Sequence, residues 1–500
     1  MSQIKFTRTE SHKTAVFFIT FFSYAFFHAN RKAFSNVKSS AAEVWTPHNL
    51  TDRILEPRDL WYSHDMFDSN DDAVKFEGVL DTAFMLAYAV GLFLNGYIGD
   101  RVNMRILLSV GMAATSVLVF IFGCVCEWTL FYNKYFYVII WIVNGLMQST
   151  GWPVVVACMG NWFGHSSRGV LLGVWSACAS VGNIIGALLV SAVLSYGYQY
   201  AFMVTSTVLL AGSFVVFVGL IPSPADVGLD PPPSEDVGKH GSVNTGAEDT
   251  APLLNGPPVE SSQYTSEDER DVVYDVQAVK PTSMSFLKAC LLPGVIPYSL
   301  AYAFLKLVNY SFFFWLPFYL SNSFHWDEST SDQLSTAYDI AGIFGGTIIG
   351  FFSDRLGKRT IMIVPMLLLS IPSLLLYSYS PNDRTINVVI MSLIGFLIGG
   401  AANLISSAVS ADLGCQKAIQ GDDKALATVT GVIDGTGSFG AALGQIAVPY
   451  LQTGLGWHSV FYLFMICMFL TAVCLFPLFL KEIRSLRCGC CRRRRSVSLQ

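Results

Sequence analysis

Five ionisable side chains interrupt apolar segments of the sequence: Arg31, Lys306, Asp339, Asp434 and, near the start of its segment, Asp81. Charged groups inside a membrane are costly, so those that occur are candidates for function. Each cation shares a helical face with two polar neighbours at spacings of three and four residues, namely Tyr24 and His28 for Arg31, and Tyr302 and Asn309 for Lys306. Arginine binds phosphate through two parallel hydrogen bonds, and lysine acts as a point charge. These residue types indicate the binding of an anion.

The same residues also have structural interpretations. Arg31 ends the strongly apolar part of its segment and could extend its side chain to the outer headgroups. Lys306 lies well inside its segment, where an ion pair with Asp339 or Asp434 is the alternative to substrate binding. Asp434 lies among small residues that permit close helix packing. We interpret it as a member of a structural or gating pair, and the carriage of a coupling proton is its alternative role.

The elements that must position these residues are membrane-spanning helices. The chain is 52% hydrophobic and 13% charged, against roughly 25% charged in soluble domains. A spanning helix needs about 20 apolar residues, and twelve segments qualify: 14–37, 77–97, 105–126, 135–157, 169–193, 199–221, 295–320, 333–352, 360–379, 386–409, 425–452 and 457–480. The sequence therefore predicts an all-α membrane protein of twelve transmembrane helices.

The twelve segments divide into two sets of six. The polar stretch 222–285 contains Pro-, Ser- and Gly-rich runs and a charged run, and it cannot bury enough apolar surface to fold alone. The predicted organisation is a six-helix bundle over 1–221, a disordered linker over 222–285, a second bundle over 286–485 and a basic, Cys-containing tail over 486–500.

A charged turn occurs twice, once in each half. Gly-x-x-x-Asp-Arg ends at Asp100-Arg101 in the first copy and at Asp354-Arg355 in the second, with a constant offset of 254 residues. Each copy joins two apolar segments. A repeat in matching positions indicates two pseudo-symmetric six-helix bundles, and we expect the four charged residues to control how the halves move.

The distribution of Lys and Arg among the short loops predicts orientation. One set of alternating loops holds eight such residues: Arg101, Arg105, Arg168, Arg355, Lys358, Arg359, Lys417 and Lys424. The opposite set, apart from its long first loop, holds only Lys134 and Arg384. Both termini, both duplicated turns and the linker are therefore predicted to be cytosolic. Asn49, in the long first loop on the other side, begins a glycosylation sequon.

The duplicated turn resembles the signature of the major facilitator superfamily, in which two six-helix bundles enclose a central site and rock against each other. Within that superfamily, residues 24–34, 144–153 and 160–164 resemble the organophosphate:phosphate antiporters. Residues 428–438 resemble the vertebrate sugar-phosphate exchanger group, and 312–320 resemble one of its members. The resemblance extends from the first predicted helix to the last.

The resemblance implies a function for the two cations. In this fold the first and seventh helices occupy equivalent places, so Arg31 and Lys306 would meet across the pseudo-two-fold axis. Their repulsion in a low dielectric needs an anion to offset it. A phosphate monoester, with a charge near −2 and a second pKa of about 6, suits such a site. The implied partners are a phosphorylated small molecule and inorganic phosphate, exchanged across the bilayer by alternating access.

Two departures from the family's pattern make the expected site less basic. Several relatives carry a Ser-Lys-Phe run on the second helix, where this chain has Gly91-Leu92-Phe93. The bacterial glycerol-phosphate members carry a histidine four residues after a tryptophan on the fifth helix, and here Trp175 is followed at that distance by Ala179. Hexose-phosphate exchange is therefore not assumed. Other phosphate- or phosphonate-like anions, or a binding subunit that requires a partner and exchanges nothing, are the alternatives.

Short motifs suggest the location of the protein. Asp249, four residues before Leu253-Leu254, resembles an adaptor-read endolysosomal sorting signal, and the exchanger group is associated with the endoplasmic reticulum. We expect a multi-pass protein of the reticulum or lysosome, with sorting adaptors and an accessory membrane subunit as possible partners. Cys488, Cys490 and Cys491 could be palmitoylated, or the tail could be unmodified.

Other biochemical classes lack support in the sequence. No nucleophile–base pair or metal-ligand spacing occurs, so an enzyme is not indicated and no cofactor is expected. Nothing in the composition suggests nucleic acid as a partner.

Overall fold

The computed structural model describes residues 2–46, 66–99, 102–163, 174–229, 290–414 and 425–497. Helices form all the regular structure in these ranges. The first half contains α1 (Ser2–Asn36), α2 (Lys38–Val44), α4 (Asn70–Gly99), α5 (Met104–Phe120), the π-helix η1 (Ile121–Val125), α6 (Cys126–Thr129), α7 (Lys134–Gln148), α8 (Gly151–Trp162), α10 (Cys178–Val193), the 3₁₀-helix η3 (Leu194–Tyr196), α11 (Tyr198–Gly219) and the 3₁₀-helix η4 (Pro224–Val227).

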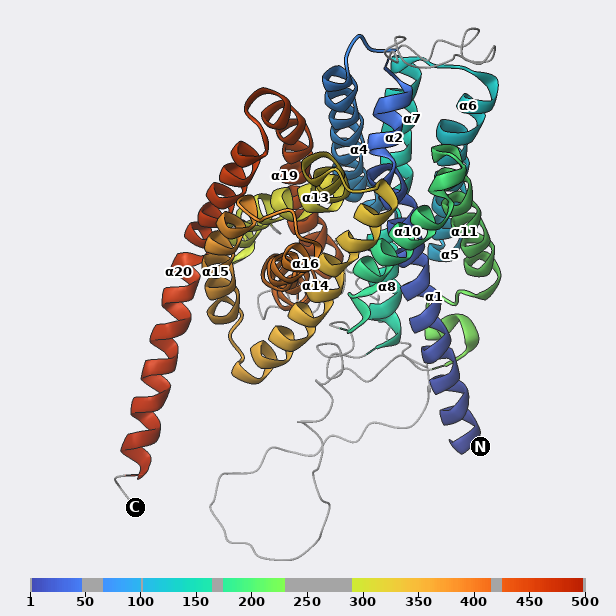
Figure 1. Ribbon diagram of the computed structural model, residues 1–500. Helices are drawn as coiled ribbons and strands as arrows, with labels where there is room; N and C mark the ends of the chain where they lie inside the picture. Colours follow the sequence, from blue (N-terminus) through green and yellow to red (C-terminus); the bar gives the residue numbers. More distant parts are fainter. Residues whose placement is uncertain are drawn as a thin grey trace, which may run out of the picture.

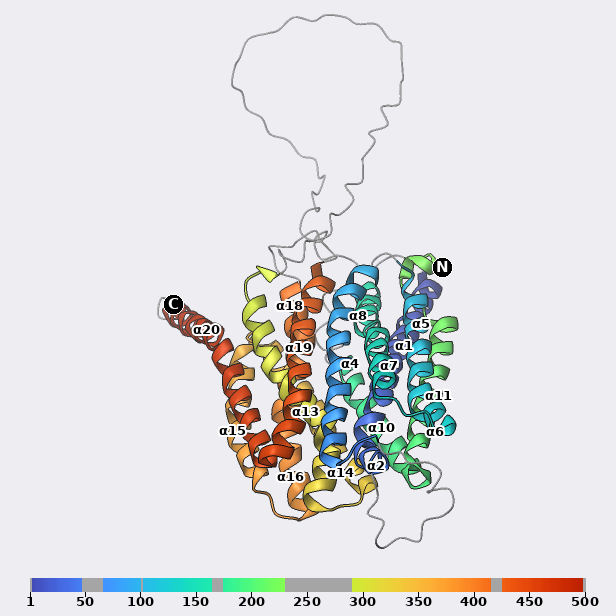
Figure 2. The same ribbon diagram turned by 90° about the horizontal axis from the view of Figure 1, so that it is seen from above.

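The second half has a similar plan. It contains α13 (Val295–Phe324), α14 (Glu328–Leu356), α15 (Thr360–Ser378), α16 (Arg384–Ile394), the π-helix η6 (Gly395–Gly399), α17 (Gly400–Leu404), the π-helix η7 (Ile405–Val409), α18 (Ser410–Gly414), α19 (Ala425–Leu455) and α20 (Trp457–Val497). The two halves lie side by side (Figures 1 and 2). The predicted all-helical fold in two bundles is confirmed.

Ten helical units of the described chain are long and apolar enough to cross a membrane. The two remaining predicted spans correspond to α1 and α19, which are 35 and 31 residues long. The inner half of α1 carries His28, Asn30, Arg31 and Lys32, and α19 carries Asp434 among small residues. Their low hydropathy therefore reflects side chains that face the interior of the protein.

Helix ends follow the capping residues in the sequence. Asn103 Oδ1 accepts from the backbone N–H of Arg105 at the start of α5, and Asn133 does the same for Phe136 at the start of α7. Asp327 and Asp383 cap α14 and α16. Side-chain oxygens at these positions satisfy backbone N–H groups that have no partner within the helix.

The first half extends further than the sequence predicted. Residues 224–227, assigned above to the linker, form η4, which Ser223 and Asp226 begin as a capping box. Trp162 Nε1 donates to the carbonyl of Ile221 at 2.8 Å and ties this segment to α8. At the other end of the chain, α20 continues to Val497, through residues expected to be a tail.

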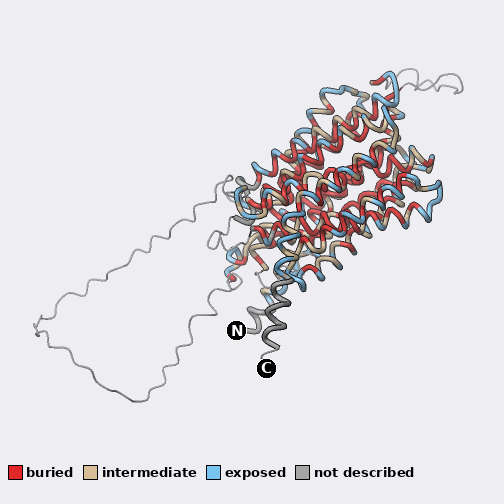
Figure 3. The backbone as a smooth tube through the Cα atoms, turned by 90° about the vertical axis from the view of Figure 1, so that its left-hand side faces the viewer, coloured by how far each residue is buried: buried red, intermediate tan, exposed pale blue. Residues whose placement is uncertain are grey.

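The halves meet mainly through α1 with α13, α4 with α19, and α10 with α14, and to a smaller extent through α8 with α19 and α2 with α13. We call the end of the bundle where α11 ends and α13 begins the linker face, and the end with α2 and the start of α14 the opposite face (Figure 2). Buried residues follow the inner sides of the helices (Figure 3). Many large apolar side chains, such as Phe214, Val218 and Leu369, are exposed on the outside, as expected for a surface in lipid.

Glycines let the helices that carry the polar residues approach closely. A Cβ on Gly182 of α10 would lie 2.2 Å from the carbonyl oxygen of Ala25 of α1, and one on Gly440 of α19 would lie 2.1 Å from that of Ala303 of α13. Real Cβ atoms do not come so close to backbone. These two contacts bring α1 against α10 and α13 against α19, with Asn183 beside His28 and Asp434 beside Lys306.

Candidate functional site

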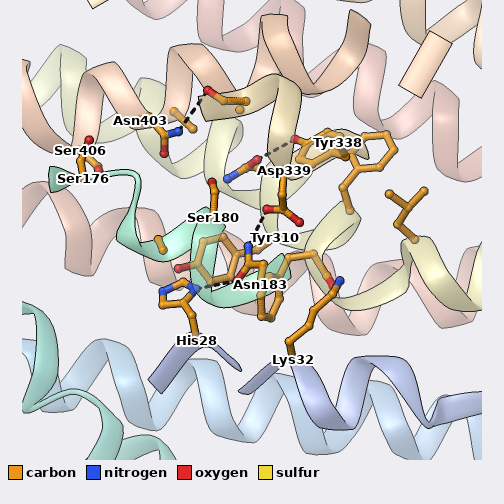
Figure 4. Close-up of a pocket in the computed structure, with 18 of the residues that line it drawn as sticks. His28, Lys32, Ser176, Ser180, Asn183, Tyr310, Tyr338, Asp339, Asn403 and Ser406 are labelled. Atoms are coloured by element: carbon orange, nitrogen blue, oxygen red, sulfur yellow. Dashed lines mark hydrogen bonds between the residues drawn. The ribbon is translucent and has the colours of Figure 1, made fainter. Parts of the chain in front are cut away.

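A cavity of about 820 Å³, measured with its open mouth, lies between the two halves. Its wall includes Tyr24, His28 and Lys32 of α1, Trp152 of α8 and Asn183 of α10 in the first half, and Tyr302, Asn309, Tyr310, Tyr338, Asp339, Asn403 and Asp434 in the second. Figure 4 shows that side chains from both halves point into this space. Six of the residues singled out in the sequence (Tyr24, His28, Tyr302, Asn309, Asp339 and Asp434) therefore come together.

Arg31 lies beside this cavity rather than in its wall. It lines a second, smaller cavity of about 240 Å³, measured in the same way, with Asn144, Gln148 and Asp81. Its Nε donates to Gln148 Oε1 at 2.9 Å, and its guanidinium carbon lies 4.6 Å from the centre of the Tyr88 ring. One edge of the guanidinium is therefore hydrogen-bonded to Gln148, and one face of it packs against the Tyr88 ring.

The terminal nitrogens of Arg31 are the unusual feature of the site. Both Nη1 and Nη2 are buried, and neither has a hydrogen-bond partner among the described residues. The residue is 4% exposed, so it does not extend to the membrane surface in the way that the structural alternative required. Buried donors of a charged group that lack acceptors are costly, and the edge formed by the two terminal nitrogens has the geometry that binds two oxygens of one phosphate.

Lys306 is fully paired in this conformation. Its Nζ donates to Asp434 Oδ1 at 2.8 Å and to Ser438 Oγ at 2.9 Å, and it lies 4.9 Å from the centre of the Tyr310 ring. The sequence analysis named Asp339 and Asp434 as possible partners of Lys306, and the structure pairs Lys306 with Asp434. Lys306 does not itself line the large cavity, although its neighbours Tyr302 and Asp434 do.

Asp339 has a different partner, from the other half of the molecule. Asn183 Nδ2 donates to Asp339 Oδ1 at 2.6 Å, and Asn183 Oδ1 lies 2.9 Å from His28 Nδ1. The three side chains form one chain from α1 through α10 to α14 (Figure 4). The remaining polar neighbour, Asn309, accepts from Tyr338 Oη at 2.6 Å within the second half.

Lys32 is a site residue that the sequence analysis missed. It lines the large cavity and is 2% exposed. Its Nζ donates to the carbonyl of Phe313 in the second half at 2.5 Å and lies 4.9 Å from the centre of that ring. The spacing of four residues from Tyr24 to His28 to Lys32 was a signal that could have found it.

A second buried ion pair lies nearer the opposite face. Lys38 Nζ is 2.5 Å from Asp81 Oδ2, and both side chains are almost fully buried. The same ammonium group lies 3.3 Å from the centre of the Trp315 ring in the second half. Asp81, the weaker candidate of the sequence analysis, thus compensates a lysine that the sequence placed outside the first span.

Hydrogen bonds join the halves from the middle of the helices to the opposite face. Besides Lys32, they include Ser191 Oγ with Ser329 Oγ at 2.6 Å, and Ser40 N with Glu328 Oε1 at 3.2 Å. Ser35 Oγ also donates to the carbonyl of Phe313 at 2.8 Å. These contacts hold the opposite face closed beyond the cavity.

The second copy of the duplicated turn forms a charge network inside its own half. Asp354 pairs with Arg359, and Arg359 Nε donates to Asp412 Oδ2 at 2.8 Å. Burial alone lowers the pKa of Arg359, but the hydrogen bonds and charges of Asp412 and Asp354 raise it overall. The guanidinium carbon of Arg355 lies 4.3 Å from the centre of the Phe351 ring, and its role with Asp354 in the movement of the halves stays a prediction.

Several predicted functional residues lie outside the described residues. They are Asp100 and Arg101 of the first turn, Asn49 of the sequon, and Asp249, Leu253 and Leu254 of the sorting motif. The side chains of Cys488, Cys490 and Cys491 are likewise not described.

Comparisons with known proteins place these features in context. Residues 73–421 match the Major Facilitator Superfamily. The chain is 52% identical to mouse sugar phosphate exchanger 3 over 96% of its own length and 95% of the relative's, and 37% identical to a mouse glucose-6-phosphate exchanger over 97% and 96%. Among solved structures, a bacterial homologue of the human lysosomal transporter Spinster superposes with a TM-score of 0.60 at 13% identity, over 95% of this chain and 98% of that one.

Proposed function

Because the chain belongs to the Major Facilitator Superfamily and, within it, to the sugar phosphate exchanger group, we propose that it transports small phosphorylated organic anions in exchange for inorganic phosphate. It is a multi-pass membrane protein of a superfamily of transporters rather than an enzyme. Transport would proceed by alternating access, with the halves rocking about the cavity between them.

One observation carries the proposal: the buried and unpartnered terminal nitrogens of Arg31. A phosphate group of charge −1.5 to about −2 at neutral pH would satisfy both nitrogens and compensate their charge. Lys32 adds a second cation at the cavity wall, 2.5 Å from a carbonyl that it could exchange for a phosphate oxygen.

Lys306 enters this proposal through its pair with Asp434. The Asp434 carboxylate lies 2.8 Å from Lys306 Nζ. Phosphate can bind Lys306 Nζ only when this carboxylate moves away. That step exchanges one anion for another and keeps the lysine compensated throughout. We therefore assign Lys306 and Asp434 to a pair that opens when phosphate reaches the second half, and Tyr24, His28, Tyr302 and Asn309 to the wall around the anion.

The network at the second turn, with its first-half counterpart at Asp100 and Arg101, would control the movement of the halves. Arg359 links the end of α14, through Asp354, to Asp412 of α18. Such a clamp sets the position of two helix ends at the linker face. We propose that this face is cytosolic, that both termini lie on the same side, and that the protein resides in the endoplasmic reticulum or lysosome. Two measurements test this part: a glycosidase-sensitive shift that depends on Asn49, and relocation of a Leu253→Ala, Leu254→Ala variant.

Uptake into proteoliposomes tests the function. Vesicles containing purified protein and internal phosphate are given labelled phosphate, glucose 6-phosphate or a phosphonate analogue. We expect uptake that requires internal phosphate. Arg31→Lys keeps the charge but loses the paired donors, so uptake should fall about tenfold or more, as expected for the loss of roughly 1.4 kcal/mol or more of a charge-assisted contact.

A matched control is available at Arg384, an exposed arginine at the start of α16. Arg384→Lys makes the same chemical change far from the cavity and should leave uptake at the wild-type rate. Wild-type kinetics in Arg31→Lys would remove Arg31 from the site, and uptake of no anion by the wild-type protein would refute the transport proposal.

A further inference from the structure

Two polar atoms of residues that line the large cavity have no hydrogen bond within the described chain: His28 Nε2 and Trp152 Nε1. Both residues line the large cavity, and they are 4% and 7% exposed. The Tyr24 ring connects them, with its centre 4.9 Å from that of His28 and 4.8 Å from that of Trp152. Unsatisfied buried polar atoms of this kind require an explanation.

The hydrogen-bond chain through Asn183 fixes which proton His28 carries. The Asp339 carboxylate only accepts, so the amide group that faces it at 2.6 Å is the NH₂ of Asn183. The amide oxygen of Asn183 then faces His28 Nδ1 at 2.9 Å, and Nδ1 must be the donor. A third positive charge next to Arg31 and Lys32 would be costly at this depth, which leaves the imidazole neutral. Its Nε2 is consequently an acceptor.

Trp152 provides the complementary group. An indole N–H can only donate, and the ring is fixed by stacking on Trp175 at a centroid distance of 5.6 Å and an interplanar angle of 26°. The residues of the cavity wall thus carry one acceptor and one donor, on rings that both neighbour Tyr24. His28 also precedes Arg31 by three residues on α1. A hydroxyl group both donates and accepts a hydrogen bond, and so matches this pair.

We propose that His28 Nε2 and Trp152 Nε1 bind hydroxyl groups on the organic part of the substrate, so that the protein selects phosphate esters of polyols and sugars over esters without hydroxyls. The inference rests on the proposed function for the position of the phosphate at Arg31. It assigns Trp152 a specificity role and gives His28 the role of an acceptor rather than a phosphate ligand.

The test compares glucose 6-phosphate and glycerol 3-phosphate with ethyl phosphate, which has no hydroxyl on carbon. The wild-type protein should prefer the hydroxylated esters. Trp152→Phe removes one hydrogen-bonding atom, whereas His28→Phe removes both ring nitrogens, including the Nδ1 that contacts Asn183. Both variants keep an aromatic ring. Each should lower the ratio of kcat/KM for the hydroxylated esters to kcat/KM for ethyl phosphate about three- to tenfold, the usual effect of one hydrogen bond.

Surface residues supply matched controls. Trp128 is 56% exposed, and His458 contacts the Tyr379 ring, outside the cavity wall. Trp128→Phe and His458→Phe should change the uptake of neither class of ester. An equal loss for all anions in the His28 and Trp152 variants, or no wild-type preference, would overturn the inference.

Calorimetric binding of the same three esters to the purified protein separates this inference from the proposed function. A protein that binds hydroxylated esters more tightly than ethyl phosphate but transports none would refute transport and support the hydroxyl site. Equal affinity for the three esters would overturn the hydroxyl site even if transport occurs.

Discussion

Replacing Gly440 with alanine should separate α13 from α19 and weaken the ion pair that these helices hold. The new Cβ would lie 2.1 Å from the carbonyl oxygen of Ala303, and an ordinary contact begins at 3.4 Å, so the helices must separate by about 1.3 Å. The neighbouring atoms belong to the backbone and cannot move away as a flexible side chain would. Overpacking of this kind costs about 1–3 kcal/mol.

The effect should reach the Lys306 ion pair because it joins the same two helices. Asp434 lies six residues before Gly440 on α19, and its Oδ1 is 2.8 Å from Lys306 Nζ. A shift approaching 1.3 Å would take that contact to about 4 Å, beyond hydrogen-bond range. We expect a melting temperature several degrees lower in detergent, and slower phosphate exchange in proteoliposomes.

The same helix provides the control. A Cβ on Gly431 would meet nothing within 4 Å, so Gly431→Ala should keep the wild-type rate of exchange and, because alanine favours helix by roughly 1 kcal/mol over glycine, should not lower the melting temperature. The two variants make the same chemical change, but only the one at Gly440 places a methyl group against the backbone of α13. Equal melting temperatures and equal exchange rates for Gly440→Ala and Gly431→Ala would refute the reasoning.

Three further predictions concern the charges and the closed face. Asp434→Asn leaves Lys306 buried without its counter-ion and should destabilise the protein by about 3–5 kcal/mol, measured by thermal unfolding. Asp434→Asn combined with Lys306→Met should recover most of that loss. A double variant no more stable than the single one would contradict this. Arg359→Gln removes the link between α14 and α18 and should slow exchange without changing the affinity for phosphate, which KM and kcat measured separately would show; a raised KM alone would argue against a role in movement. Cysteines at Ser191 and Ser329, whose Oγ atoms are 2.6 Å apart, should form a disulfide on oxidation that stops exchange until it is reduced, and undiminished exchange by the cross-linked protein would argue against alternating access.

The fold could be predicted from the sequence because apolar length is the dominant constraint in a membrane. The choice of partner for Lys306 could not, since Asp339 and Asp434 are both acidic residues in predicted spans. It depends on which helix packs against α13. Gly440 decides this, because its missing side chain admits the backbone of Ala303, and a glycine in a helix does not by itself reveal which helix it meets.

Two lysines were missed for different reasons. Lys32 follows Arg31 directly, and the helical face defined by Tyr24 and His28 in fact points to Lys32, four residues beyond His28, as well as to Arg31. Lys38 was placed outside the first span, which was predicted to end at residue 37. The chain instead continues as α2, buried against Asp81. The buried Lys38–Asp81 ion pair thus accompanies helical structure beyond the end of the apolar segment at residue 37.

The geometry also explains how binding could be linked to opening of the opposite face. A ligand shifts a conformational equilibrium only by the difference in its interactions with the two states. Lys32 lines the cavity and also donates across the halves to Phe313, and Asn183 and Asp339 line the cavity while bonding to each other across the same boundary. An anion that attracts Lys32, or a hydroxyl that changes the hydrogen bonding of His28 and so of Asn183, would act on atoms that already hold the halves together. In the proposed mechanism, coupling between site and gate therefore needs no intermediate element, because the same side chains belong to both.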